Sequence, residues 1–185
     1  MRLFRLGVIA AIALTLGACG GSSKKTVSST TTPLPSGCPA QTLMTIVGSS
    51  GPVQVAAATR KAVTRNNFIT VYLFAKLLTQ PDSDYKNFIG ASFRVDGEGA
   101  IIASGKNSVA TAPPSPGSYT TAKNAPLQLL EYSVQQNGRL LTTAPAKPSS
   151  SVTLEISTLT SSLVCGTITG PQGSSNFIAD RIDAN

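Results

Sequence analysis

Short runs of alternating apolar and polar residues, separated by turn-forming residues, fill the chain from Cys38 onward. Ser151–Thr158 shows the pattern clearly, because Val152, Leu154 and Ile156 alternate with polar residues as in a strand with one buried face. The predicted strands are Gln41–Val47, Asn67–Leu78, Phe88–Val95, Ala100–Ala103, Leu127–Gln135, Arg139–Thr143, Ser151–Thr158, Leu163–Thr169 and Phe177–Ile182. The pattern therefore predicts eight or nine short strands.

The connections between these runs indicate the fold class. Asp96-Gly97 and Asn137-Gly138 are typical of tight hairpins. Asn67–Leu78 is apolar on both faces, which places it in the middle of the core. Val55–Thr64 is rich in alanine, and its pattern allows either two helical turns or a loop. We expect an all-β domain with at most one short helix: an antiparallel β-sandwich or, as the alternative, a β-barrel, since both need the same alternation.

The N-terminal segment has the pattern of an export signal. Arg2 and Arg5 precede an apolar run, Leu6–Leu16, that is broken only by Gly7 and Thr15. This run is too short to span a bilayer as a helix, which needs roughly 20 residues. A positive start, a short apolar run and small residues at its end indicate a secretory signal.

Leu16, Gly17, Ala18 and Cys19 close this segment. They resemble the lipobox of bacterial lipoprotein signal peptides, although an ordinary signal peptide ending near a cysteine is the alternative. The resemblance implies cleavage after Ala18 and attachment of fatty acyl chains, such as palmitate, to Cys19. It also implies a lipid-anchored protein of the bacterial cell envelope, and Gly20 in place of an aspartate favours the outer membrane over the inner one. Whether the protein faces the periplasm or the cell surface stays open.

The chain divides into three parts by composition. Residues 1–18 form the signal, residues 19–37 form the lipidated cysteine with a tether of mostly Gly, Ser, Thr and Pro, and residues 38–185 form one β-domain. The tether has too few apolar residues to offset the entropy of ordering it. The third part is long enough for a core of its own.

Cysteine usage agrees with export. Cys38 and Cys165 are the two cysteines of the β-domain, and in an oxidising compartment such a pair predicts a disulfide. Two free buried thiols are the alternative.

The basic charge does not indicate nucleic-acid binding. The formal net charge of +7 falls by two when the signal is removed, and the remaining lysines and arginines are spread singly except for Arg60, Lys61 and Arg65. These three are not interleaved with aromatic residues, as a single-strand binder would require. We expect a solvated face, with contact to anionic lipid or polysaccharide as the alternative.

Candidate chemistry is sparse. The chain has no histidine, which excludes Ser-His-Asp and Cys-His catalysis and removes the usual transition-metal ligand. Ser83 and Lys86 match a Ser-x-x-Lys motif, but we expect them in a connection between strands, where the match is coincidental. No cofactor or metal is expected.

Two carboxylate pairs and the aromatic residues complete the candidates. The pair at Asp82 and Asp84 and the pair at Asp96 and Glu98 flank a predicted strand, roughly 25 Å apart at ~3.3 Å per residue. That separation excludes one shared calcium site or a glycosidase pair, so turn residues are the simpler interpretation. The absence of tryptophan and the single occurrence of each tyrosine disfavour sugar stacking.

Gly105–Pro126 is a proline-rich stretch of 22 residues, unusually long for a loop inside one domain. It predicts a partner-contact loop with Pro113, Pro114 and Tyr119, or else a short strand around Tyr119. We expect a non-enzymatic binding or structural β-domain of the envelope that contacts the bilayer through Cys19 and an envelope protein or surface polysaccharide. An envelope hydrolase with a histidine-free site is the alternative.

Overall fold

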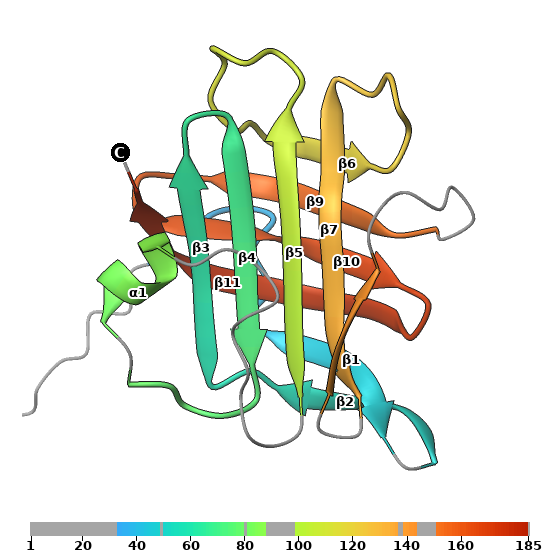
Figure 1. Ribbon diagram of the computed structural model, residues 1–185. Helices are drawn as coiled ribbons and strands as arrows, with labels where there is room; N and C mark the ends of the chain where they lie inside the picture. The colour runs from blue at the N-terminus through green and yellow to red at the C-terminus, as the bar shows by residue number, and fades with distance from the viewer. Residues whose placement is uncertain are drawn as a thin grey trace, which may run out of the picture. The chain divides into compact units, whose positions relative to one another are not determined.

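The computed structural model describes residues 33–48, 50–79, 81–87, 99–136, 139–143 and 151–184. These residues form eleven strands and one short helix (Figure 1). The elements are β1 Leu43–Gly48, β2 Gly51–Ala56, β3 Thr59–Arg65, β4 Phe68–Phe74, α1 Asp82–Asn87, β5 Ala100–Asn107, β6 Gly117–Thr120, β7 Leu127–Gln136, β8 Arg139–Thr143, β9 Thr153–Leu159, β10 Leu163–Gly170 and β11 Gly173–Asp183. The all-β class with a single short helix is confirmed, with more strands than the sequence pattern shows.

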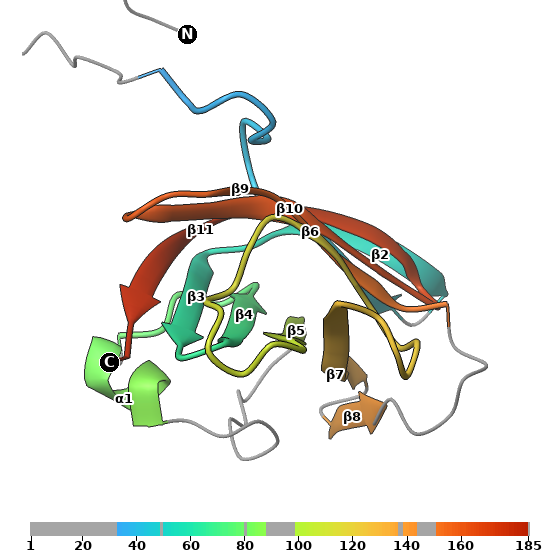
Figure 2. The same cartoon turned by 90° about the horizontal axis from the view of Figure 1, so that it is seen from above.

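Eight of the strands close into a barrel. They follow the order β10-β9-β6-β7-β5-β4-β3-β11, and the pairing of β11 with β10 closes the ring. β3, β4, β5 and β7 form one wall, and β9, β10 and β11 cross behind it (Figures 1 and 2). The barrel, which the sequence pattern gave as the alternative to a sandwich, is the architecture found.

The pairing is mixed, where the pattern predicted antiparallel strands throughout. β6 pairs with β7 in parallel, and β11 pairs with β3 in parallel. β1 joins β11 and pairs with β2, while β8 pairs with β7 outside the ring. Alternation along a strand carries no information about the direction of its neighbour, so the two parallel pairs left no mark in the sequence.

The alanine-rich stretch Val55–Thr64 is neither helix nor loop. Its ends belong to β2 and β3, and β3 pairs with β4 over its whole length. Ala62 is buried inside the barrel, whereas Val63 is buried on the outer side. Pairing with two neighbours therefore overrides the weak local preference of alanine for helix.

The other predicted strands are found with ends that differ from the expected ones by at most four residues, and Arg139–Thr143 is found with its predicted bounds. β4 is flanked by β3 and β5, as its two apolar faces predicted. The Asn137-Gly138 pair lies outside the described residues, but the strands it joins, β7 and β8, pair antiparallel. The predicted strand Phe88–Val95 and the turn Asp96-Gly97 also lie outside them.

Apolar side chains gather in two clusters, one inside the barrel and one outside. The inner cluster fills the space between the two walls with residues such as Ile69, Val71 and Leu73 of β4. The outer cluster lies under α1 and consists of Val63, Tyr72, Phe74, Tyr85, Ala100, Ile102 and Ile182. The second face of β4 is thus covered by a small patch instead of a full layer.

The predicted disulfide is present between Cys38 and Cys165, with Cα atoms 5.2 Å apart. The segment before Cys38 lies along β9, where Ser157 Oγ donates to the Gly37 carbonyl at 2.9 Å and Thr158 Oγ1 donates to the Ser36 carbonyl at 2.9 Å. The first described residues are therefore held to the β9–β10 wall by one covalent bond and two hydrogen bonds.

Candidate binding groove beside the helix

The outer wall carries an aromatic stripe created by strand alternation. Phe68, Thr70, Tyr72 and Phe74 of β4 share the outer face, because successive side chains of a strand point to opposite sides. The register sets Ser104 of β5 directly opposite Thr70. Their hydroxyl oxygens lie 3.0 Å apart and form a hydrogen bond.

Helix α1 packs its one aromatic side chain onto this stripe. Tyr85 is 1% exposed, and its ring meets Tyr72 edge-on with centroids 5.8 Å apart. Tyr72 in turn stacks with Phe74 at 6.5 Å. Lys61 Nζ of β3 lies 3.4 Å from Asp82 Oδ1 in the first turn of α1, so an ion pair adds to the aromatic contact that holds the helix.

The helix refines one expectation from the sequence. Ser83 and Lys86 lie in the connection between β4 and β5, as expected, but they lie there in the helix α1, which the sequence pattern did not predict. Both are exposed, however, so the pair does not form the buried nucleophile and base that Ser-Lys catalysis needs. Asp84 lies in the first turn of α1 and Lys86 in its last turn, so both charges interact favourably with the helix dipole.

A groove of about 300 Å³ opens between the helix and the strand wall. Its lining residues are Val63, Arg65, Phe68, Thr70, Tyr72, Tyr85, Lys86, Ser104, Leu130 and Glu131. Four strands and the helix contribute, so residues far apart in the sequence converge here. The volume is at the lower end of the range for small-molecule sites.

The tyrosines of the groove are neutral hydrogen-bonding groups. Burial raises the pKa of Tyr72 well above its ordinary value, the nearby Glu131 carboxylate raises it further, and a hydrogen bond with Thr70 opposes both. The pKa of Tyr85 is also raised, first by burial and then by Asp82 and Asp84. Neither phenol ionises near neutral pH, so neither supplies a phenolate base or nucleophile there.

The rim of the groove carries charges of both signs. Arg65 at the end of β3 and Lys86 on α1 are exposed cations, and Glu131 of β7 is a partly buried carboxylate. One oxygen of Glu131 accepts a hydrogen bond from Ser133 Oγ at 3.1 Å. The charged residues that line the groove are thus two cations and one carboxylate, and three further carboxylates, Asp82, Asp84 and Asp183, lie near Tyr85 or Lys86.

Strand alternation divides the basic cluster Arg60, Lys61 and Arg65. Lys61 and Arg65 lie on the outer wall with Val63, whereas Arg60 lies on the opposite face with Ala62. Lys61 is 3.4 Å from both Asp82 and Asp180, so it forms ion pairs within the domain. Of the three, Arg65 alone lines the groove.

The proline-rich stretch Gly105–Pro126 contributes its first residues to β5 and its middle to β6, and the rest forms the loops on either side of β6. Gly117–Thr120 forms β6, so the short strand around Tyr119 is the alternative that the structure confirms. Tyr119 is fully buried, donating to the Ser115 carbonyl at 2.9 Å and accepting from the Ser115 N–H at 3.1 Å. Pro114 is buried and Pro113 is exposed. Of these candidate contact residues, Pro113 alone is available to a partner.

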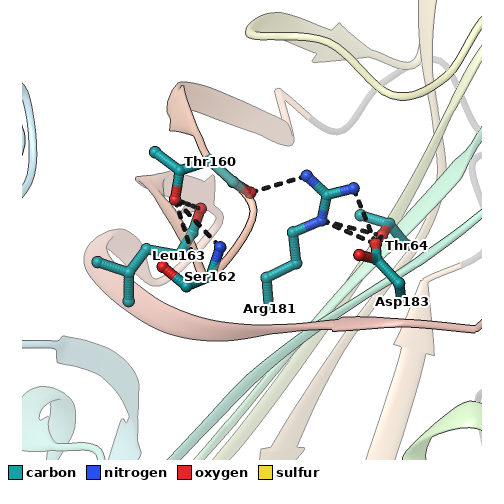
Figure 3. Close-up of polar contacts among 6 residues, drawn as sticks. All are labelled: Thr64, Thr160, Ser162, Leu163, Arg181 and Asp183. Carbon is teal, nitrogen blue, oxygen red and sulfur yellow. Dashed lines mark hydrogen bonds and ion pairs between the residues drawn. The ribbon is translucent and has the colours of Figure 1, made fainter.

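A polar cluster away from the groove joins β3 and β11 to the β9–β10 turn. Arg181 Nη1 donates to the Thr160 carbonyl at 2.7 Å, and Arg181 Nη2 lies 2.8 Å from Asp183 Oδ1 (Figure 3). Thr64 Oγ1 donates to the same carboxylate oxygen. These bonds join β3, β11 and the β9–β10 turn where β3 and β11 run in parallel, so the cluster is structural.

Of the groove residues, Phe68 and Glu131 were not among the sequence candidates, whereas Arg65 and Lys86 were considered only as part of the basic cluster and of the Ser-x-x-Lys match. The only signal was the period-two stripe from Phe68 to Phe74, which also fits a strand buried on both faces. The expectation that the tyrosines are isolated holds along the chain but not in space, because Tyr72 and Tyr85 are in contact.

The described residues contain no group of three or more acidic, cysteine or histidine side chains placed to hold a metal ion. The pair at Asp82 and Asp84 lies in α1, and the pair at Asp96 and Glu98 lies outside the described residues. Within the described part of the chain, no helix is both long and apolar enough to span a bilayer.

Comparisons with protein-family models, curated proteins and solved structures find no match to this chain.

Proposed function

We propose that this protein is a lipid-anchored domain of the bacterial cell envelope that binds a ligand, without transforming it, in the groove beside α1. The observation that carries the binding function is the convergence of an exposed Phe68, hydroxyl groups and two cations in one groove. Such a mixture of apolar surface and a few polar groups is typical of ligand sites.

The composition of the groove supports binding more than catalysis. Its tyrosines stay protonated near neutral pH, and its lining includes no cysteine or histidine. General acid–base catalysis needs a group whose pKa lies near the working pH. A screen of the purified protein against generic ester, peptide and glycan substrates checks this, and turnover lost on substitution of a groove residue would contradict it.

Anchoring is supported by the Leu16-Gly17-Ala18-Cys19 motif, and the Cys38–Cys165 disulfide is typical of an oxidising compartment. One acyl chain alone binds a membrane only reversibly, whereas two or three together give stable anchoring. The outer membrane is the proposed location.

The anchoring proposal predicts that Cys19→Ser yields a protein without lipid. Intact mass spectrometry of the membrane fraction should find the native protein cut after Ala18 and heavier by its acyl chains. The variant should keep its signal or be released without lipid. A native protein whose mature Cys19 carries no acyl group would contradict anchoring and leave the binding function to be judged separately.

A further inference from the structure

We propose that the groove beside α1 binds an acidic sugar unit: a pyranose ring that carries a carboxylate, as in a uronic-acid-containing polysaccharide. This inference rests on the proposed function, because it names the ligand class of the same groove. It uses three features of the lining: an open aromatic ring, uncharged hydroxyl groups and two cations.

Phe68 supplies the apolar contact. Its side chain is 42% exposed at the groove, whereas Tyr72 and Tyr85 are 1% exposed and form the floor. One face of a pyranose presents mainly C–H groups, which pack well on the negative face of an aromatic ring. The sequence disfavoured sugar stacking because it has no tryptophan and its tyrosines occur singly. The fold answers the second point by bringing Tyr72 and Tyr85 together with Phe68, and the stacking surface is then Phe68 alone.

The hydroxyl groups of a sugar need partners that both donate and accept. Thr70 and Ser104 bond to each other, and each hydroxyl retains further hydrogen-bonding capacity. Glu131 accepts from Ser133 with one oxygen, which leaves its other lone pairs for ring hydroxyls. A purely apolar ligand would displace water from the remaining hydrogen-bonding positions of these groups without replacing it, at a cost in affinity.

The charges favour an acidic sugar over a neutral one. Within the described residues, the ion pairs involve Lys61 and Arg181, and no carboxylate lies within 4.0 Å of the Arg65 or Lys86 nitrogens. An arginine fork binds a carboxylate with two parallel hydrogen bonds, and a lysine adds a point charge. A volume of about 300 Å³ suits a single ring instead of an extended ligand.

The test compares D-glucuronate with D-glucose, which differ only by a carboxylate in place of a hydroxymethyl group. Ligand-observed NMR titration of the purified full chain should give saturable glucuronate binding with a Kd at least tenfold below that for glucose. Arg65→Gln and Lys86→Gln should each weaken glucuronate binding by roughly tenfold, the usual loss for a hydrogen bond to a charged group. Lys76→Gln is the matched control, because Lys76 is an exposed cation beyond the opposite end of β4.

Phe68→Ala separates a sugar site from a simple anion site. It should weaken glucuronate binding and leave inorganic phosphate binding, if there is any, unchanged. Thermal melts establish that each variant is folded, and Lys86→Gln, on the exposed helix surface, carries the test if Arg65→Gln does not fold. Three results would each overturn the inference. The protein could bind glucose and glucuronate equally well, or it could bind no sugar. Alternatively, phosphate could displace glucuronate while Phe68→Ala leaves glucuronate binding unchanged. None of these results depends on the lipid state of Cys19.

Discussion

Gly166 shows how closely two strands approach in this barrel. The register of β10 against β9 shifts between Cys165 and Gly166, and a Cβ atom at position 166 would lie 1.9 Å from the Glu155 carbonyl oxygen. No side chain fits at that distance, so glycine is required at the bulge. Nothing in the local sequence marks this position, since the contact is with a residue of the neighbouring strand.

Asp183 gives a prediction for the pH dependence of stability. Its hydrogen bond from Thr64 and its bonds to Arg181 lower the pKa of the carboxyl below 3.8. A lowered pKa in the folded state means that the stabilisation is fully present above the unfolded pKa and is lost as the pH falls through the folded pKa. The native protein should therefore lose stability below about pH 4, and because Asp183 is largely exposed the effect should be small.

Urea unfolding at a series of pH values checks this against Asp183→Asn. The variant should have a lower midpoint at pH 7, and the difference from the native protein should shrink below pH 4. A difference that stays constant across this range would show that the carboxylate charge contributes nothing to stability.

At the scale of elements, two short strands, β6 and β2, show how the barrel closes and where its sheet has an open edge. β6 has only four residues, yet it bridges β9 and β7 and so completes the ring. The residues of β6, which lie in the middle of the proline-rich stretch Gly105–Pro126, are for this reason part of the barrel and not of a loop. β2 is the opposite case, because among the described residues it pairs with β1 alone.

Pro52 protects this open edge, which gives a second prediction. The Ala57 N–H donates to the Thr42 carbonyl at 3.1 Å, so by antiparallel alternation the backbone groups of Pro52, Gln54 and Ala56 point away from β1. Proline offers no N–H donor at such a position. Pro52→Thr should restore a donor and increase self-association in a protein that stays folded.

Sedimentation velocity over a range of protein concentrations measures the effect. Ser118→Thr is the control, because Ser118 is exposed on β6, which is paired on both sides. If Pro52→Thr associates no more strongly than the parent protein, then Pro52 is not what protects the edge of β2.

At the scale of the whole molecule, the disulfide links two residues that are far apart in the sequence. It closes a loop with a sequence separation of 127 residues and joins the start of the domain to β10. In the chain-entropy model such a loop stabilises the folded state by ~4–5 kcal/mol. We predict that replacing both Cys38 and Cys165 by serine lowers the free energy of unfolding by up to that amount.

Equilibrium urea unfolding of the native protein with and without reductant, beside the double variant, measures this loss. The reduced native protein and the variant should unfold at the same lower concentration of urea. If the reductant leaves the native midpoint unchanged although the thiols are free, the disulfide does not contribute to stability.

The features that the sequence predicted well are those set by local chemistry. Alternation located β9 with its buried Leu154 and Ile156, and a pair of cysteines in a domain expected to be exported predicted the disulfide. The groove was not predictable in the same way. Phe68 and Tyr85 come from different elements, and their convergence depends on α1 packing beside β3 and the end of β11 (Figure 2).

By itself, the sequence determined that the domain is all-β, where most of its strands lie and which cysteines pair. These properties depend on side-chain alternation, turn residues and composition, each of which is visible in a few neighbouring residues. Only the tertiary structure decided between barrel and sandwich, placed Val55–Thr64 in strands and formed the groove from Arg65, Phe68 and Lys86. The reason is that strand order, strand direction and the packing of a helix on a sheet are set by contacts between residues far apart in the chain, and such contacts leave no period in the sequence.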